Sequence, residues 1–258
     1  MSYFIFGGSG FIGTHLIALI DNLYPGTKIY NLDIVENNHE GKSTYINCDV
    51  RSDINVDVPI TSEDVIFNFA AVHRTPGHPD QAYFETNIRG AENVCAFAEK
   101  FGIKKIVFTS SIAPYGAAED LKTEETLPTP NTPYGISKLV AEKIHTIWQA
   151  KKLNERQLTI VRPGVVFGKG ENGNFTRLYW GIRGGKFFYP GRKDTIKACI
   201  YVKELVRFML YRLENHSEGV ELYNCTFESA FTIEQIVETM KKATGLQRTI
   251  VKVPGSLL

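Results

Sequence analysis

A glycine-rich turn near the N-terminus constrains this chain more than any other feature of its sequence. The apolar run Tyr3 to Phe6 leads into GGSGFIG, and a helical apolar pattern then extends from about Phe11 to Asn22. A strand, a tight turn and a helix N-terminus form an anion cradle, because backbone N–H groups and the helix dipole face the anion and missing side chains allow close approach. The sequence therefore predicts a pyrophosphate site. Its expected residues are Gly7, Gly10, Phe11, Ile12 and Gly13.

An acidic residue follows the second expected strand, which covers Lys28 to Leu32. Asp33 lies about twenty residues beyond the glycines, where a carboxylate can accept hydrogen bonds from both adenosine ribose hydroxyls and would repel a 2′-phosphate. A turn-forming Asp is the simpler interpretation. In the context of the glycine turn, Asp33 favours NAD over NADP as the cofactor.

Short apolar runs alternate with helical stretches from the N-terminus to Pro163. Further strands are expected at Thr44 to Asn47, Val65 to Phe69, Lys105 to Ser110 and Leu158 to Arg162, and helices at about Gln81 to Lys100 and Pro133 to Lys152. Runs such as VIFNFAA are apolar on both faces, as central parallel strands between helices require. This predicts an α/β fold with a Rossmann-type doubly wound parallel sheet.

The sequence changes character after Pro163, where Gly-rich and aromatic segments mix with helical stretches at about Lys203 to Glu214 and Ile233 to Thr244. We expect residues 1–163 to form the cofactor-binding domain. Residues 164–258 would form a smaller C-terminal substrate-binding lobe, interleaved with the first domain. Ligands of such folds bind at the carboxyl ends of the strands.

Composition excludes several classes of protein. The 29 Lys and Arg and 28 Asp and Glu give a net charge of +1, so the basic excess that nucleic-acid binding needs is missing. The N-terminus resembles neither a signal peptide nor a membrane span, so we expect a cytoplasmic protein without a membrane partner.

The four cysteines lie far apart in the sequence and lack the spacing of a metal site. They are expected to be reduced, structural thiols, with no metal bound: Cys48, Cys95, Cys199 and Cys225.

Tyr134 and Lys138 form a YxxxK pair one helical turn apart, on a helix that Thr132 can cap and Pro133 can begin. A phenol with a pKa near 10 is a poor base at neutral pH, and Lys138 together with the helix N-terminus could lower that pKa. Ser111 follows the expected strand Lys105 to Ser110, where its hydroxyl could donate to a substrate oxygen while Tyr134 exchanges the proton.

Several motifs in chain order resemble the extended short-chain dehydrogenase/reductases, and more narrowly the NAD-dependent epimerase/dehydratase branch that acts on nucleotide sugars. The resemblance covers nearly the whole chain. It rests on GGSGFIG, Asp33, Cys48-Asp49-Val50, Asn68-Phe69-Ala70-Ala71, Asn87 in NIRGAENV, Thr109-Ser110-Ser111, Tyr115-Gly116, Tyr134-Gly135-Ile136-Ser137-Lys138, and Arg162-Pro163 with Gly168.

The resemblance implies roles for individual residues. Tyr134 would be the catalytic acid/base, Lys138 would orient the nicotinamide ribose, and Ser111 would polarise the reacting oxygen. Asp49 and Val50 would lie beside the adenine of NAD. Ala70 and Ala71 would line the cofactor groove.

Substrate contacts are implied more loosely. Asn174 matches the family position that holds the substrate's phosphates. Lys197 stands where relatives usually carry an arginine for the pyrophosphate; lysine keeps the charge but cannot make the bidentate contact that arginine makes. Arg192 and Arg177 compete for that role. His73 would contact either the sugar or a neighbouring backbone group, and a metal bound by His73 and His78 is disfavoured because no third ligand accompanies them.

Two departures from the family pattern narrow the function. Ile112 and Ala113 stand where dehydratases carry an acidic pair, so we expect no elimination of water. The chain also ends at VKVPGSLL, before a last helical part that many relatives have, so the second lobe is either trimmed or reduced.

The expected activity is NAD-dependent 4-epimerisation of a nucleotide sugar. An NAD(P)H-dependent nucleotide-4-keto-sugar reductase shares every residue named and remains an alternative, and a non-catalytic NAD-binding regulatory protein is an alternative of another class. We expect a homodimer, with the helices Gln81 to Lys100 and Pro133 to Lys152 forming its interface.

Overall fold

The computed structural model divides into two compact units. The first comprises Met1–Pro163 and Val202–Cys225, and the second Gly164–Tyr201 and Thr226–Leu258. The described residues are 1–36, 40–73, 77–117, 120–217, 219–229 and 231–254. The first segment of the first unit ends at Pro163, where the sequence places the boundary, and the two units are interleaved. Val202–Cys225 returns to the first unit, because it supplies a helix and an edge strand to the main sheet.

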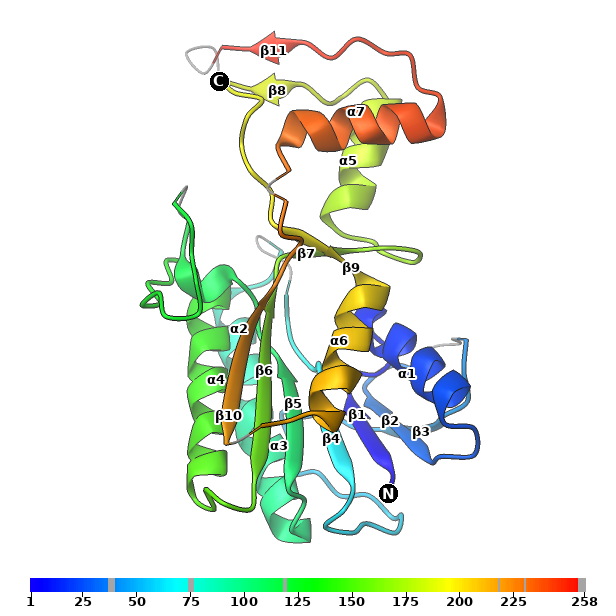
Figure 1. Cartoon of the computed structure of the whole chain (residues 1–258), viewed down its shortest axis with the longest axis vertical. Coiled ribbons are helices and arrows are strands. Elements are labelled where there is room, and N and C mark those ends of the chain that lie inside the picture. Colours follow the sequence, from blue (N-terminus) through cyan, green and yellow to red (C-terminus); the bar gives the residue numbers. More distant parts are fainter. Residues whose placement is uncertain (37–39, 74–76, 118–119, 218, 230, 255–258) are drawn as a thin grey trace. The chain divides into compact units, whose positions relative to one another are not determined.

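The first unit is built on a seven-stranded parallel sheet of the expected doubly wound type (Figure 1). The strands are β1 (Tyr3–Phe6), β2 (Ile29–Asp33), β3 (Thr44–Asn47), β4 (Val65–Asn68), β5 (Lys105–Thr109), β6 (Gln157–Pro163) and β10 (Val220–Cys225). Their order is β10-β6-β5-β4-β1-β2-β3. The order reverses beside β1, so the carboxyl ends of β1 and β4 flank the switch point where ligands bind in such folds.

Helices cover both faces of this sheet. They are α1 (Phe11–Leu23), α2 (Asp80–Tyr83), α3 (Arg89–Phe101), α4 (Pro133–Ala150) and α6 (Val202–Glu214), with a π-helical turn η1 (Phe84–Ile88) and a 3₁₀ turn η2 (Ala113–Tyr115). α3 packs against α4, and α1 packs against α6. The single helix expected over Gln81 to Lys100 is therefore interrupted by η1, for which the sequence pattern gave no indication.

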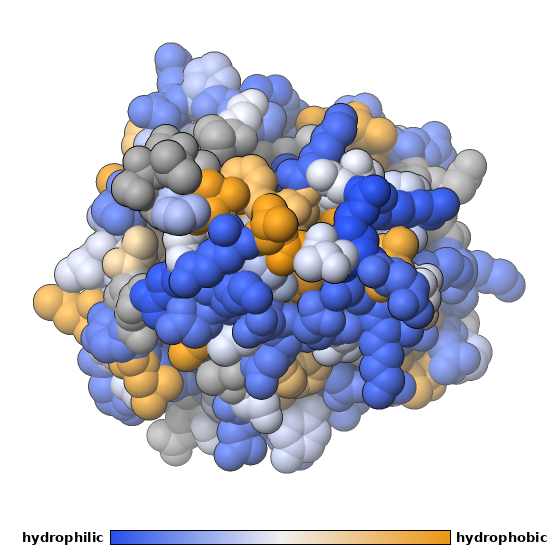
Figure 2. Space-filling view, turned by 90° about the horizontal axis from the view of Figure 1, so that it is seen from above, coloured by the Kyte–Doolittle hydropathy of each residue, from blue (hydrophilic) through white to orange (hydrophobic). Residues whose placement is uncertain are grey.

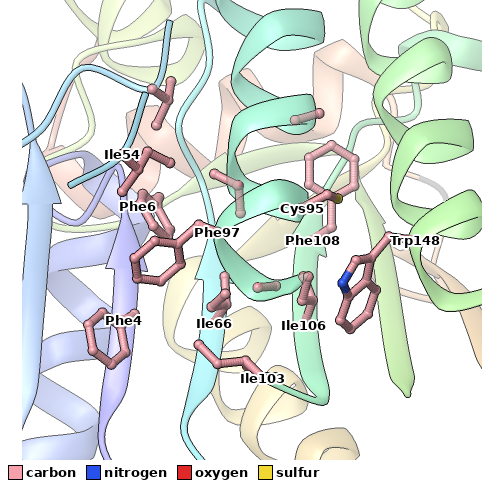
Figure 3. Packing of buried hydrophobic residues seen from close by; sticks show 14 of the residues in the cluster. Phe4, Phe6, Ile54, Ile66, Cys95, Phe97, Ile103, Ile106, Phe108 and Trp148 are labelled. Atoms are coloured by element: carbon pink, nitrogen blue, oxygen red, sulfur yellow. The ribbon is translucent and has the colours of Figure 1, made fainter. Parts of the chain in front are cut away.

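Aromatic side chains fill the core between the sheet and α3 (Figure 3). Phe97 of α3 lies between two residues of β1, with ring centroids 5.7 Å from Phe4 and 5.6 Å from Phe6. Trp148 closes the α4 side of the same cluster and is 2% exposed. Burying each such side chain stabilises the fold by roughly 1.5–3 kcal/mol, which fixes the sheet that presents the site.

In its described residues, the second unit contains two small two-stranded parallel sheets and two helices. β7 (Val165–Phe167) pairs with β9 (Cys199–Tyr201), and β8 (Tyr189–Pro190) pairs with β11 (Lys252–Val253). α5 (Asn174–Arg183) and α7 (Ile233–Thr244) enclose a small core around Ile182, Tyr189 and Val237. Figure 2 looks onto the side of this unit where β8 and β11 lie in Figure 1, and apolar side chains there are bordered by strongly hydrophilic ones.

Candidate active site

The glycine turn joins β1 to α1 and lies against the segment that follows β4. Gly7 has φ +75°, and a Cβ atom there would stand 2.6 Å from the backbone nitrogen of Ala70. A Cβ atom on Gly13 would stand 2.6 Å from Gly8 Cα, so the helix start also packs tightly on the turn. Gly10 is the N-cap of α1 and provides no side-chain cap, which leaves backbone N–H groups at this helix end for an anion.

Asp33 ends β2 and its carboxylate contacts the glycine turn directly. One oxygen accepts a hydrogen bond from the Ser9 N–H at 3.1 Å, and the other accepts one from the Val35 N–H at 3.2 Å. Asn31 donates to the Ser9 hydroxyl at 3.0 Å. An ionised carboxylate accepts about four hydrogen bonds, so Asp33 can hold the turn and still accept from ribose hydroxyls.

Asp49 and Val50 follow β3 and have different surroundings. Arg51 donates to the Asp49 carboxylate with an N–O distance of 2.6 Å, and this hydrogen bond lowers the pKa of Asp49. Val50 is buried, and its side chain packs against Gly90. A Cβ atom added to Gly90 would lie 2.8 Å from Val50 Cγ2. An open hollow of about 360 Å³ adjoins Asp49; it is lined by Asp49, Arg51, Ser52, Glu85 and Arg89.

Asn87 in the π-helical turn η1 fixes the chain that follows β4. Its amide accepts a hydrogen bond from the Val72 N–H at 2.8 Å and donates to the Val72 carbonyl at 3.1 Å and to the Ser137 hydroxyl at 2.8 Å. This ties the Ala70 and Ala71 segment to α4, beside Lys138. Sequence reasoning treated Asn87 only as part of a motif. His73, one residue beyond Val72, is exposed.

Tyr134 and Ser111 meet at the carboxyl end of β5. Thr132 caps α4 by accepting from the Gly135 N–H at 3.0 Å, with Pro133 next, as the sequence predicts, and this places Tyr134 in the first turn. Burial raises the pKa of the Tyr134 phenol, while its hydrogen bond with Ser111 acts in the opposite direction. The expected lowering of this pKa is therefore wrong for the chain alone, because burial outweighs the favourable partner.

Lys138 points from α4 towards β5. Its ammonium donates to the Thr109 carbonyl at 2.5 Å and lies 4.4 Å from the centre of the Phe108 ring. The residue is 2% exposed, and desolvation lowers the pKa of Lys138 to about 7, with Glu142 opposing that shift. Lys138 therefore changes its charge close to neutral pH.

Glu142 lies one turn beyond Lys138 and forms a buried ion pair with Arg162 of β6. The guanidinium donates to both carboxylate oxygens, at 2.8 and 2.6 Å, and both side chains are 4% exposed. The Ser110 hydroxyl donates to the same carboxylate at 2.5 Å, so this pair also holds the residue before Ser111. Sequence reasoning missed Glu142, although an acidic residue four positions after Lys138 on a buried helix face was a usable signal.

The remaining candidates lie in the second unit and are exposed. Asn174 begins α5 and accepts a hydrogen bond from Arg177 at 2.6 Å. Arg192 donates to Asp194 at 2.8 Å, and Lys197 is held through its backbone N–H to the Phe231 carbonyl at 2.8 Å. Asn174, Arg192 and Lys197 thus have no hydrogen-bond partner in common among these contacts.

The described parts of the chain contain no group of three or more His, Cys, Asp or Glu that could hold a metal ion, and the four cysteines are free. Within the same residues, no helix is both long enough and apolar enough to cross a membrane.

Comparison with known proteins gives a consistent set of relatives. A family model described as the NAD dependent epimerase/dehydratase family matches residues 3–226. The N-acetyl-alpha-D-glucosaminyl-diphospho-ditrans,octacis-undecaprenol 4-epimerase of Escherichia coli O157:H7 is 35% identical over 239 residues, covering 93% of this chain and 71% of that protein.

Solved structures share the fold. MoeE5 in complex with UDP-glucuronic acid and NAD superposes with a TM-score of 0.84 at 23% identity, covering 98% of this chain and 86% of the other. The UDP-glucose 4-epimerase of Thermus thermophilus, in complex with NAD, gives a TM-score of 0.78 at 21% identity, covering 98% of this chain and 86% of the other.

Proposed function

Because the chain belongs to the NAD-dependent epimerase/dehydratase family, we propose that it is an NAD-dependent 4-epimerase acting on a hexose linked to a diphosphate. One observation carries this proposal. Tyr134 and Ser111 share a hydrogen bond at the carboxyl end of β5, on the sheet edge that also bears the glycine turn, with Lys138 one helical turn away. An acid/base, an oxygen-binding hydroxyl and a cation are the groups that alcohol oxidation needs.

NAD fits the residues of the first unit. The uncapped start of α1 would take the pyrophosphate, Asp33 the adenosine ribose, and Lys138 the nicotinamide ribose. Asp49 and Val50 would lie beside the adenine, and Ala70 and Ala71 would line the groove. When bound, NAD supplies the acceptor for the C4 hydride and later returns that hydride.

The protein's own groups move the proton. The Tyr134 oxygen takes the proton of the C4 hydroxyl while the Ser111 hydroxyl holds the oxygen that becomes a carbonyl. Burial disfavours the Tyr134 phenolate, so the positive charge of Lys138, one helical turn along α4, is needed to stabilise it. After the keto sugar turns over, so that the opposite face of C4 is reduced, Tyr134 returns its one proton to the C4 oxygen while the Ser111 hydroxyl still holds that oxygen.

The proposed substrate is a nucleotide sugar, with Asn174, Arg192, Lys197 and His73 as its candidate contacts. A polyprenyl-diphospho-N-acetylhexosamine is the second candidate, since the Escherichia coli relative named for such a substrate matches 93% of the chain. The two classes share the sugar and the diphosphate and differ only in what the diphosphate carries beyond them.

One experiment separates these activities. The purified protein is incubated with UDP-, GDP- and dTDP-hexoses, with their N-acetylated forms and with a polyprenyl-diphospho-N-acetylhexosamine, with and without NADH, and the products are identified. We expect C4 epimers without added NADH and no product lacking one water. Product only from 4-keto sugars with NADH would identify the reductase, and binding of NAD without any product would identify a regulatory protein.

We also propose a cytoplasmic homodimer that forms through α4. Ile136 and Ile147 are 40% and 60% exposed on this helix, eleven residues apart, and therefore lie on one face. Light scattering of the purified protein tests the dimer, and a monomeric mass at micromolar concentration would exclude it.

A further inference from the structure

The two units carry opposite charge although the whole chain is nearly neutral. The first unit holds 18 Lys and Arg and 23 Asp and Glu, whereas the smaller second unit holds 11 and 5. The excess concentrates in residues 173–193, which contain five cations, six aromatic residues and no carboxylate. Such an asymmetry indicates an anionic partner for the second unit.

α5 displays these residues on one exposed face. Arg177, Trp180 and Arg183 are exposed and recur every three positions, so they follow one side of the helix. Trp180 is 56% exposed, with the Arg183 guanidinium 5.2 Å from its ring centre. An indole that stays this exposed while a guanidinium lies on its ring combines an apolar body with a charged rim.

Two more cations join the C-terminal end of this helix. Lys186 belongs to the turn that folds back on Gly181, to which its N–H donates at 2.9 Å. The Arg248 guanidinium lies directly against Gly185, so closely that an added Cβ atom there would collide with it. Trp180, Arg183, Lys186 and Arg248 form what we call the basic aromatic end of α5.

These cations differ from three others in the same unit, which form ion pairs. Arg192 is paired with Asp194, Lys193 with Glu234 and Lys241 with Glu238. Within the described parts of the chain, no carboxylate pairs with Arg183, Lys186 or Arg248. Arg183 is also nine residues from Asn174, about 14 Å along the helix, so this end is separated from the residue proposed to meet the substrate's phosphates.

We propose that the basic aromatic end of α5 docks the protein on an anionic membrane surface. Arg and Lys attract acidic lipid headgroups, and an exposed Trp enters the boundary between headgroups and acyl chains. The partner is argued from charge complementarity, and the inference rests on the proposed function in its lipid-linked form, since a polyprenyl substrate has to be reached at a bilayer. It replaces, for this surface, the sequence expectation of no membrane partner.

Vesicle binding tests the proposal independently of catalysis. The whole chain is mixed with phosphatidylcholine vesicles in which phosphatidylglycerol makes up none, one fifth or two fifths of the lipid. The bound fraction is measured by flotation at several salt concentrations. We compare the wild type with Arg183→Glu/Lys186→Glu/Arg248→Glu, with Trp180→Ala, and with Lys28→Glu/Lys143→Glu/Arg207→Glu, which reverses three exposed cations of the first unit.

We expect binding that needs phosphatidylglycerol and declines with salt. The triple change in the second unit should weaken it on the order of 100-fold or more, Trp180→Ala should weaken it less, and the first-unit control should bind like the wild type. No binding at low salt to the vesicles richest in phosphatidylglycerol, or equal losses in both triple variants, would overturn the proposal. Displacement from vesicles by equimolar single-stranded oligonucleotide would also overturn it, since the surface would then bind any polyanion.

The proposed activity is measured in parallel with a water-soluble UDP-N-acetylhexosamine, without vesicles. Turnover there should be unchanged in all three variants, because none of the substituted residues belongs to the proposed catalytic groups. Flotation without turnover of any sugar would contradict the proposed function and leave the membrane surface standing. Turnover without flotation would support the proposed function and contradict the membrane surface.

Discussion

Tyr134 is partly buried in the first turn of α4, and burial raises the pKa of its phenol. Replacing it with Phe removes only the oxygen, from a helix whose cap is supplied by Thr132. We predict that Tyr134→Phe folds and binds NAD like the wild type but loses turnover by about 10²- to 10⁴-fold, the usual contribution of a general acid/base. Steady-state kinetics with NAD titration measures both, and a near-normal rate would refute the proton-transfer role.

Asp33 has two tasks that one substitution separates. Its carboxylate would repel a 2′-phosphate, and it also holds Ser9 in the glycine turn. Asp33→Ala should therefore weaken NAD binding and narrow the difference between NAD and NADP. Asp33→Asn should distinguish NAD from NADP as poorly as Asp33→Ala does, while keeping part of the hydrogen bonding in the glycine turn. Fluorescence titration of both cofactors measures this, and wild-type binding of NADP as tight as NAD would disprove the preference.

Glu142 acts through its neighbours, since its carboxylate binds Arg162 and Ser110 and favours the charged form of Lys138. In Glu142→Gln the pKa of Lys138 should fall below its value of about 7, so the alkaline decline of kcat/KM should begin at lower pH. Breaking the buried pair should also cost roughly 3–5 kcal/mol of stability.

A matched variant distinguishes positioning from folding in this case. Arg162→Lys keeps the charge but loses the bidentate contact, so it should destabilise the protein without shifting the pH profile. If both variants merely lower the melting temperature and leave the pH profile in place, Glu142 has only a structural role.

At the scale of elements, the π-helical turn η1 connects the segment proposed to line the cofactor groove with α4, which carries the proposed acid/base. Asn87→Ala removes three hydrogen bonds of a buried side chain, which should cost about 2–3 kcal/mol and should weaken NAD binding. Gln149→Ala is the control, because this buried amide also donates to two backbone carbonyls but lies at the far end of α4. Equal NAD affinities in the two variants would contradict the role assigned to η1.

The sequence predicted the elements that carry a strong apolar signal. β1 and β4 are buried on both faces, so VIFN and similar runs stand out from their surroundings. β10 was missed because Glu221 and Asn224 interrupt VELYNC, which therefore shows neither a continuous apolar run nor a strict alternation, and β8 and β11 are too short to show a pattern. The break at η1 depends on where Asn87 finds partners, which no local propensity encodes.

The candidate site likewise contains residues that the sequence predicted and residues that depend on the complete fold. Spacing indicated Tyr134 and Lys138, and the strand end indicated Ser111, because these positions follow from one element each. The direction of the Tyr134 pKa shift could not be predicted, since it depends on burial produced by the whole fold. Glu142 and Arg162 meet only after α4 packs beside β6.

At the scale of the whole molecule, one histidine makes stability depend on pH. His145 is fully buried against Phe108, with Ala141 O 2.8 Å from Nδ1 and the Asn68 amide 3.2 Å from Nε2. Desolvation, with a contribution from Lys138, lowers the pKa of His145 from 6.5 to about 4. Between these values the unfolded chain binds a proton that the folded chain does not, so falling pH favours unfolding.

We therefore predict a loss of about 2 kcal/mol from this group between pH 7 and pH 5. Urea midpoints at the two pH values measure it. His145→Gln should be less stable than the wild type at pH 7 and should show a smaller decrease towards pH 5. An equal decrease in both proteins would assign the acid sensitivity to other groups.

The return of Val220–Cys225 to the main sheet has a consequence for synthesis on the ribosome. β6 ends at Pro163, whereas β10, which pairs along its outer edge, begins only at Val220. At the usual rate of about 5–20 residues per second, β6 leaves the exit tunnel roughly 3–11 seconds before its partner. During each round of translation the nascent chain thus carries a bare, β-branched strand edge, which is the feature that chaperones shield and that neighbouring nascent chains on a polysome can pair with.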